Sequence, residues 1–142
     1  MPAFEITLDI ARPPAEVFAF LTDVSKLPEW QSSATAVEIE GAIQKGTRFR
    51  ESRRFLGRDV RTTLEVTRYE PPERFDVAAR ESPVSFAISH ELTPASTGTR
   101  LRAQVDVKLG AMMRIAAQGP LKLAEREFRE DFGRLKEILE RP

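Results

Sequence analysis

The sequence predicts an α+β domain in which an antiparallel sheet is covered by one long C-terminal helix. Apolar and polar residues alternate with a period of two in seven segments, and this alternation is typical of half-buried strands. From about Ala111 to Leu139 the residues instead favour helix, with apolar side chains at i, i+4, i+7 and i+11 counted from Phe128. No repeat, linker or low-complexity segment interrupts the chain, so we expect residues 1–142 to form a single domain.

One strand and two short helices precede the main part of the predicted sheet. Residues 4–10 alternate and are stopped by Pro13-Pro14, and Pro14 suits the first turn of a helix because its missing N–H costs nothing there. A second short helix, or a turn, runs through residues 23–27. We expect it to end at Pro28, because proline restricts the conformation of the residue before it.

Six further strands are predicted to form an unbroken antiparallel meander. We expect them at residues 37–39, 47–55, 60–66, 75–81, 84–92 and 101–107. Tyr69 would continue the outward face that carries Thr67. One face of such a meander must be covered, and only the C-terminal helix is long enough, although Gly119-Pro120 should kink or split that helix. Small inward residues such as Ala79 beside bulky ones are compatible with an internal cavity.

Composition and charge argue against several kinds of site. The 22 basic and 22 acidic residues cancel, so we expect no nucleic-acid partner, and the absence of cysteine removes disulfides, thiolate metal sites and thiol nucleophiles. With one histidine, no calcium-loop pattern and no glycine-rich phosphate loop, we expect neither a metal nor another cofactor. No signal peptide or membrane-spanning apolar run is visible, so we expect a cytoplasmic location without membrane insertion.

Four phrases of the sequence carry a resemblance to a known family. They are IARPPAEVFAFLTDVSKLPEW at 10–30, GTRFRE at 46–51, EVTRYEPPERF at 65–75 and HELTPASTGTRLR at 90–102. In this order they resemble the START-like (SRPBCC) superfamily and, within it, the polyketide cyclase/dehydrase-type proteins. The resemblance implies a helix-grip fold, in which a seven-stranded curved antiparallel sheet wraps around the C-terminal helix with two short helices between strands 1 and 2. It also implies that a ligand would lie between the sheet and that helix.

Three polar residues are the candidates for chemistry inside such a cavity. His90 has the same phase as Phe86, Ile88 and Leu92 and is therefore predicted to point inward, where it could be a general acid or base, an anchor for a ligand, or a hydrogen-bonded core residue. Glu51 and Arg53 share the inward face of one strand. They could form a polar end that orients a ligand carboxylate or carbonyl, or a salt bridge at the cavity mouth, because buried charges must be paired.

The candidate ligand-binding set combines these residues with the apolar inward faces, and it leaves Trp30 as a hydrophobic plug beside the second short helix. The set is Phe49, Glu51, Arg53, Leu64, Phe75, Val77, Phe86, Ile88, His90, Ala103, Met112, Ile115 and Phe128. His90 is its candidate catalytic residue.

Three functions fit this sequence. The leading hypothesis is binding of a small hydrophobic or aromatic molecule, lipid-like or polyketide-like, without efficient catalysis. The second is an enzyme resembling polyketide cyclases or dehydratases, in which His90, Glu51 or Arg53 would move protons; no close acid–base pair can be read from the sequence. The third is a protein-interaction module like the co-chaperone regulators of the superfamily, because a fold does not fix a function. Each of the three functions is compatible with a homodimer.

Overall fold

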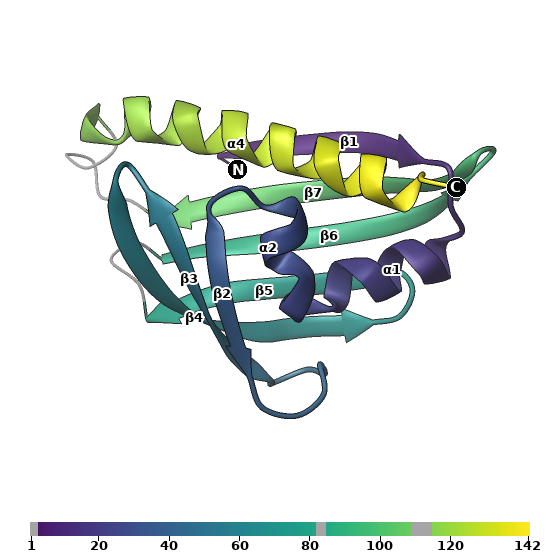
Figure 1. The fold of residues 1–142 in the computed structure, drawn as a ribbon, viewed down its shortest axis with the longest axis horizontal. Coiled ribbons are helices and arrows are strands. Elements are labelled where there is room, and N and C mark those ends of the chain that lie inside the picture. Colours follow the sequence, from purple (N-terminus) through teal and green to yellow (C-terminus); the bar gives the residue numbers. More distant parts are fainter. Residues whose placement is uncertain (1–2, 82–84, 109–114) are drawn as a thin grey trace.

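The computed structural model describes residues 3–81, 85–108 and 115–142, and in this part of the chain seven strands form one curved sheet (Figure 1). The strands are β1 (Phe4–Ile10), β2 (Ala34–Ile39), β3 (Arg48–Phe55), β4 (Arg58–Glu70), β5 (Arg74–Glu81), β6 (Ser85–Ala95) and β7 (Gly98–Lys108). Their order in the sheet is β1-β7-β6-β5-β4-β3-β2, and every neighbouring pair is antiparallel. The predicted meander is therefore confirmed, with β1 paired to its last strand.

The helices connect and cover this sheet as the sequence predicts. Between β1 and β2, which form opposite edges of the sheet, lie α1 (Pro14–Thr22), the 3₁₀ turn η1 (Val24–Lys26) and α2 (Leu27–Trp30). The long helix α4 (Gln118–Leu139) runs along the sheet beside β1 (Figure 1). This arrangement is the helix-grip fold expected from the sequence.

One proline position differs from its predicted role and another agrees with it. Pro28 does not end the second short helix but lies in the first turn of α2, where the missing N–H leaves no helical hydrogen bond unmade. The predicted break at Gly119-Pro120 is seen as a turn at Ala117, which separates helical residues 115–116 from α4, and Gly119 and Pro120 lie in the first turn of that helix. Both prolines therefore mark helix starts, because a proline is tolerated there and not in a helix interior.

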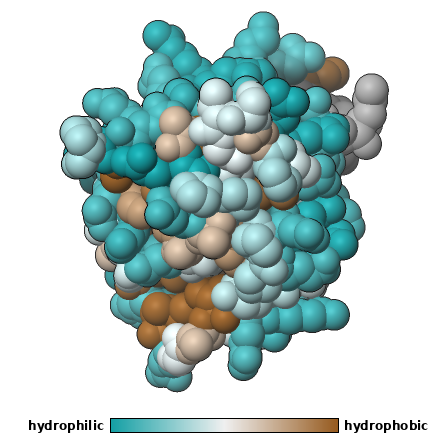
Figure 2. All heavy atoms as spheres, turned by 90° about the vertical axis from the view of Figure 1, so that its right-hand side faces the viewer, coloured by the Kyte–Doolittle hydropathy of each residue, from teal (hydrophilic) through white to brown (hydrophobic). Residues whose placement is uncertain are grey.

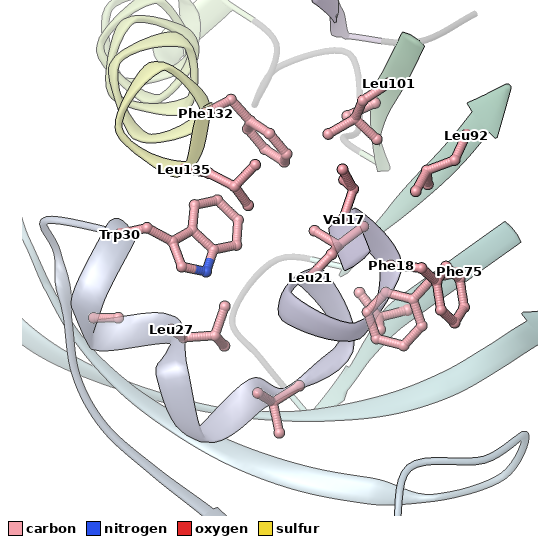
Figure 3. Close-up of a cluster of buried hydrophobic side chains, with 14 of the residues drawn as sticks. Val17, Phe18, Leu21, Leu27, Trp30, Phe75, Leu92, Leu101, Phe132 and Leu135 are labelled. Carbon is pink, nitrogen blue, oxygen red and sulfur yellow. The ribbon is translucent and has the colours of Figure 1, made fainter. Parts of the chain in front are cut away.

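The core lies where α1, α2 and the C-terminal half of α4 meet the sheet (Figure 3). The Phe132 ring lies in the middle of this cluster, 4.9 Å from the Trp30 ring and 4.7 Å from the Phe128 ring, measured between centroids. Leu135, one turn further along α4, is fully buried. Truncating such large buried side chains leaves cavities that neighbouring groups fill only partly, so this cluster holds α4 against the sheet.

Polar contacts fix the C-terminal end of α4 to the segment that joins β1 to α1. The Arg12 guanidinium donates from Nε to the Leu139 carbonyl and from Nη2 to the Arg141 carbonyl, each over 2.8 Å. The Ala11 N–H donates to Glu140 Oε2 over 2.8 Å. The bond to Leu139 satisfies one of the carbonyl groups that the end of a helix leaves without intrahelical partners.

Tyr69 lies on the inner side of the sheet, so its predicted outward position is wrong. The register of β4 on β5 shifts between Val66 and Arg68, which is a β-bulge that inserts one extra residue into β4. Because side chains alternate with a period of two, the extra residue reverses the facing of those after it. The Tyr69 ring packs 5.6 Å from Phe18 and 6.5 Å from Phe75.

The face that carries the C-terminal end of α4 is mostly hydrophilic, with a hydrophobic patch toward the lower left of the view (Figure 2). Among the described residues, the large hydrophobic side chains that are exposed are Leu56, after β3, and Ile115, before α4. No helix in the described part of the chain is long and apolar enough to cross a membrane.

A glycine at the start of β7 lets the β6–β7 turn pack against the same β1–α1 junction. Gly98 has a φ of +147°, and a Cβ added there would overlap the Ile10 carbonyl and lie 2.6 Å from the Arg12 nitrogen. We expect Gly98→Ala to lower the free energy of unfolding by about 2–4 kcal/mol, because backbone strain and overlap both oppose the methyl group. Urea unfolding monitored by circular dichroism measures this change.

Gly133→Ala is the matched control for this substitution. Gly133 lies on the exposed side of α4, and a Cβ added there meets nothing within 4 Å. Alanine is the better helix former by about 1 kcal/mol, so this variant should be as stable as the wild type or more stable. Similar losses in both variants would contradict a specific need for glycine at position 98.

Candidate functional site

A cavity of about 450 Å³ lies between the sheet and α4. Apolar side chains from six strands and from the short helices make up most of its wall, including Phe4, Leu21, Val60 and Val107. The middle and N-terminal part of α4 close it on the other side. Cavities of about 300–1,000 Å³ with mainly apolar walls are the usual size of sites for small molecules.

The side chains of α4 explain why space remains beside a tightly packed core. In the C-terminal half of the helix Phe132 and Leu135 fill the gap to the sheet and are almost completely buried. Toward the N-terminal end the wall combines the small Ala117, Pro120 and Ala124 with the larger Leu121 and Phe128. The small side chains leave room between the helix and the curved sheet, so the same helix that completes the core roofs a cavity.

The structure brings most of the predicted ligand-binding residues to this cavity. The predicted residues that line it are Phe49, Glu51, Arg53, Leu64, Phe75, Val77, Phe86, Ile88, His90 and Phe128. Ala103 does not reach the wall, because it is buried within the sheet opposite His90. Ile115 is 75 % exposed and also lies outside the wall, and Met112 lies outside the described residues.

Glu51 and Arg53 form a bidentate ion pair in the cavity wall. Arg53 Nε donates to Glu51 Oε1 over 3.1 Å, and Arg53 Nη2 donates to Glu51 Oε2 over 3.0 Å. Nη2 also donates to Gln31 Oε1 over 2.6 Å and Nη1 to Ser33 Oγ over 2.8 Å. Four of the five guanidinium N–H groups are therefore engaged within the protein. Glu51 is only 5 % exposed, so the pair is a fixed part of the wall.

Two carboxylates of α4 face the same region of the cavity. Asp131 Oδ1 accepts hydrogen bonds from the Ser32 N–H (3.1 Å), the Ser32 hydroxyl (3.3 Å) and Arg134 Nη1 (3.2 Å). Burial nevertheless raises the pKa of Asp131 above its ordinary value. One turn earlier, burial and then the nearby Asp131 charge raise the pKa of Glu127, and Arg53 opposes this shift. We call Gln31, Ser33, Glu51, Arg53, Glu127 and Asp131 the polar wall.

His90 lies in an apolar part of the wall and is held as a neutral imidazole. Its ring stacks on Phe75 at 5.6 Å between centroids and lies 5.9 Å from Phe132. Nδ1 is 2.8 Å from the Phe75 carbonyl, which can only accept, so Nδ1 carries the proton and Nε2 is left as an acceptor. Burial lowers the pKa of His90 to about 4. A base with so low a pKa has little tendency to take a proton from a ligand at neutral pH, which disfavours general-base chemistry.

Trp30 also belongs to the cavity wall, in agreement with its predicted place as a hydrophobic plug. It is 1 % exposed, and its indole Nε1 has no hydrogen-bond partner among the described residues. Figure 3 shows the indole nitrogen on the edge of the ring that points away from Leu135. Buried donors of this kind are rare in folded proteins and cost about 1–3 kcal/mol when unpaired.

Glu127 and Asp131 are not among the site residues predicted from the sequence, although a signal for them exists. Ala124, Glu127, Phe128, Asp131 and Leu135 follow one another at helical spacing on one side of α4. Two acidic residues thus interrupt an apolar stripe, and a charge in that position needs a partner or a function. Gln31 and Ser33 carry no comparable signal, because their role depends on contact with Arg53.

The described residues contain no group of three or more His, Asp or Glu side chains placed to hold a metal ion. The carboxylates of the polar wall are instead engaged by Arg53, Arg134 and Ser32, or face the cavity singly. The arrangement can therefore hold a mainly apolar molecule and contact its polar groups with carboxylates, amides and hydroxyls.

Solved structures from several organisms share this fold, whereas no curated protein sequence is significantly similar to the chain. Protein CV1439 from Chromobacterium violaceum has a TM-score of 0.78 at 14% identity over 98% of both chains. A Rhodobacter sphaeroides protein has a TM-score of 0.74 at 25% identity, over 95% of this chain and 89% of that one. The di-domain ARO/CYC StfQ from the steffimycin biosynthetic pathway has a TM-score of 0.80 at 16% identity, over 96% of this chain and 50% of StfQ.

The sequence itself matches one family over almost its entire length. The family model described as polyketide cyclase / dehydrase and lipid transport covers residues 1–140. The match includes all four phrases that carry the resemblance, and the helix-grip fold agrees with it. The chain belongs to the polyketide cyclase/dehydrase and lipid transport family.

Proposed function

We propose that this protein binds a small hydrophobic or aromatic molecule in the cavity between the sheet and α4. The cavity of about 450 Å³ with a mainly apolar wall is the observation that carries the proposal. Moving apolar surface from water into such a wall contributes about 25 cal/mol for each Å² buried. The aromatic rings of Phe49, Phe75 and Phe128 offer faces and edges against which a flat ligand can pack.

A cyclase- or dehydratase-type reaction in the same cavity is the second candidate. The family description and the carboxylates of the polar wall favour it, because carboxyl groups can move protons. Against it, the imidazole of His90 is a weak base and the Glu51 carboxylate is tied to Arg53. Binding therefore has the stronger support. An interaction module that uses only its surface would not require an open cavity.

The first test is binding of a neutral apolar probe, N-phenyl-1-naphthylamine, followed by its fluorescence and by thermal unfolding. Saturation at about 100 times Kd should stabilise the protein by roughly 2.7 kcal/mol through mass action. Ala124→Phe should abolish binding, because a bulky ring would fill the cavity from α4. Ala19→Phe on the exposed side of α1 should leave binding unchanged.

Two results would contradict a role for the cavity. Absence of any fluorescence change or thermal shift with the wild type, also in a screen of sterols and aromatic compounds, would count against ligand binding altogether. Equal binding by Ala124→Phe and the wild type would place the probe outside the cavity.

The buried His90 should make stability depend on pH in a defined window. Its folded-state pKa of about 4 is depressed below the unfolded value of 6.5, so the unfolded state binds the extra proton between these values. Stability is therefore fully present above pH 6.5 and is lost as the pH falls toward 4. Between pH 7 and pH 5 this titration should remove about 2 kcal/mol from the free energy of unfolding.

His90→Phe should remove this contribution while keeping an aromatic ring stacked on Phe75. Carboxylates titrate in the same range in both proteins. The measured quantity is therefore the change in the free energy of unfolding between pH 7 and pH 5, obtained from urea unfolding and compared between wild type and variant. Parallel pH dependences of the two proteins would show that His90 is not held neutral by burial.

A further inference from the structure

The polar wall carries an excess of negative charge. The charged residues of the described part of the chain that line the cavity are Glu51, Arg53, Glu127 and Asp131, which give three carboxylates and one guanidinium. Arg134 pairs with Asp131 from outside the lining. A polar group of a bound molecule would therefore meet acidic oxygens more often than cationic donors.

The one cation in the lining has little capacity left for a ligand. Four N–H groups of Arg53 already donate to Glu51, Gln31 and Ser33, which leaves a single N–H on Nη1. A bidentate contact to a ligand carboxylate would require Arg53 to release Glu51. That exchange would strand a buried carboxylate without its partner, which is strongly unfavourable. The sequence-based idea that Arg53 orients a ligand carboxylate therefore has no support in this geometry.

Unused acceptors, by contrast, are available in the polar wall. The three hydrogen bonds to Asp131 all end on Oδ1, and no described residue donates to its Oδ2. Glu127 lines the cavity, and no hydrogen bond or ion pair within the described residues engages its carboxylate. His90 adds the acceptor Nε2 in the apolar part of the wall. Each of these atoms can accept from a hydroxyl or amino group but not from a carboxylate.

The site does not depend on this acidic character alone. The cavity is defined by its mainly apolar wall, to which the indole of Trp30 contributes, and the acidic groups occupy only one part of that wall.

We propose that the cavity selects neutral or cationic ligands that carry a hydroxyl or amino group, and that it discriminates against carboxylates. Glu127 is the specificity-determining residue in this assignment, because its carboxylate is in the wall and unpartnered. The inference rests on the proposed function, since it names the chemistry of the ligand for that cavity. A carboxylate ligand would add a fourth negative charge to a wall with one engaged cation.

Three ligands of the same shape test the proposal at pH 7. We would measure displacement of N-phenyl-1-naphthylamine by 2-naphthylmethylamine, 2-naphthylmethanol and 2-naphthoate. The amine and the alcohol should each displace the probe at concentrations at least about tenfold lower than 2-naphthoate. Glu127→Gln should reduce the preference for the amine over 2-naphthoate by about tenfold. Glu130→Gln removes the same charge from an exposed position paired with Arg126, and it should leave the preference unchanged.

The outcomes separate this inference from the proposed function. If the neutral probe binds and 2-naphthoate displaces it as well as the amine does, the cavity binds apolar molecules but the acidic selection is wrong. An equal change in Glu127→Gln and Glu130→Gln would also overturn it, because the effect would then be long-range charge. If the probe itself does not bind, the proposed function fails.

Discussion

The unequal packing of α4 along its length is the constraint on which the rest of this structure depends. Phe132 and Leu135 fill the space to the sheet at the C-terminal end, where Arg12 also binds the last carbonyl groups of the helix. Toward the N-terminal end the small Ala117, Pro120 and Ala124 alternate with the larger Leu121 and Phe128 and leave part of that space open. One helix thus acts both as the main cover of the core and as the roof of the cavity, and the stability of its anchored end allows the other end to stay unfilled.

The polar wall contains buried charges, which are costly unless they are paired. The Glu51–Arg53 pair is held by Gln31 and Ser33 from the junction of α2 and β2, so every charged atom of the guanidinium has a partner from its own chain. Such a pair contributes little net stability, yet removing one partner costs about 3–5 kcal/mol because the other charge is stranded. The pair therefore works as a rigid boundary of the cavity. Glu127 and Asp131, which are less completely satisfied, are the groups that a ligand can still engage.

Much of this arrangement could be predicted from the sequence, because strand alternation is a local property. The alternation of apolar and polar residues correctly placed Glu51, Arg53 and His90 on the inner face of the sheet, and the four phrases identified the family. Local pattern failed at Tyr69, where a bulge in β4 shifts the alternation by one residue. It also could not show that Arg53 is saturated, because Gln31 and Ser33 approach it only after the chain has folded. The ligand chemistry depends on that saturation and therefore required the structure.

A crystal structure of the protein grown with 2-naphthylmethanol tests the central claim most directly, because it shows where a small aromatic molecule lies. We expect electron density for the ring system between the sheet and α4, against Phe75 and Phe128, with the hydroxyl within hydrogen-bond distance of Glu127 or Asp131. Density for the ligand only on the outer surface, or a cavity filled by the inward movement of α4 in the presence of saturating ligand, would contradict it.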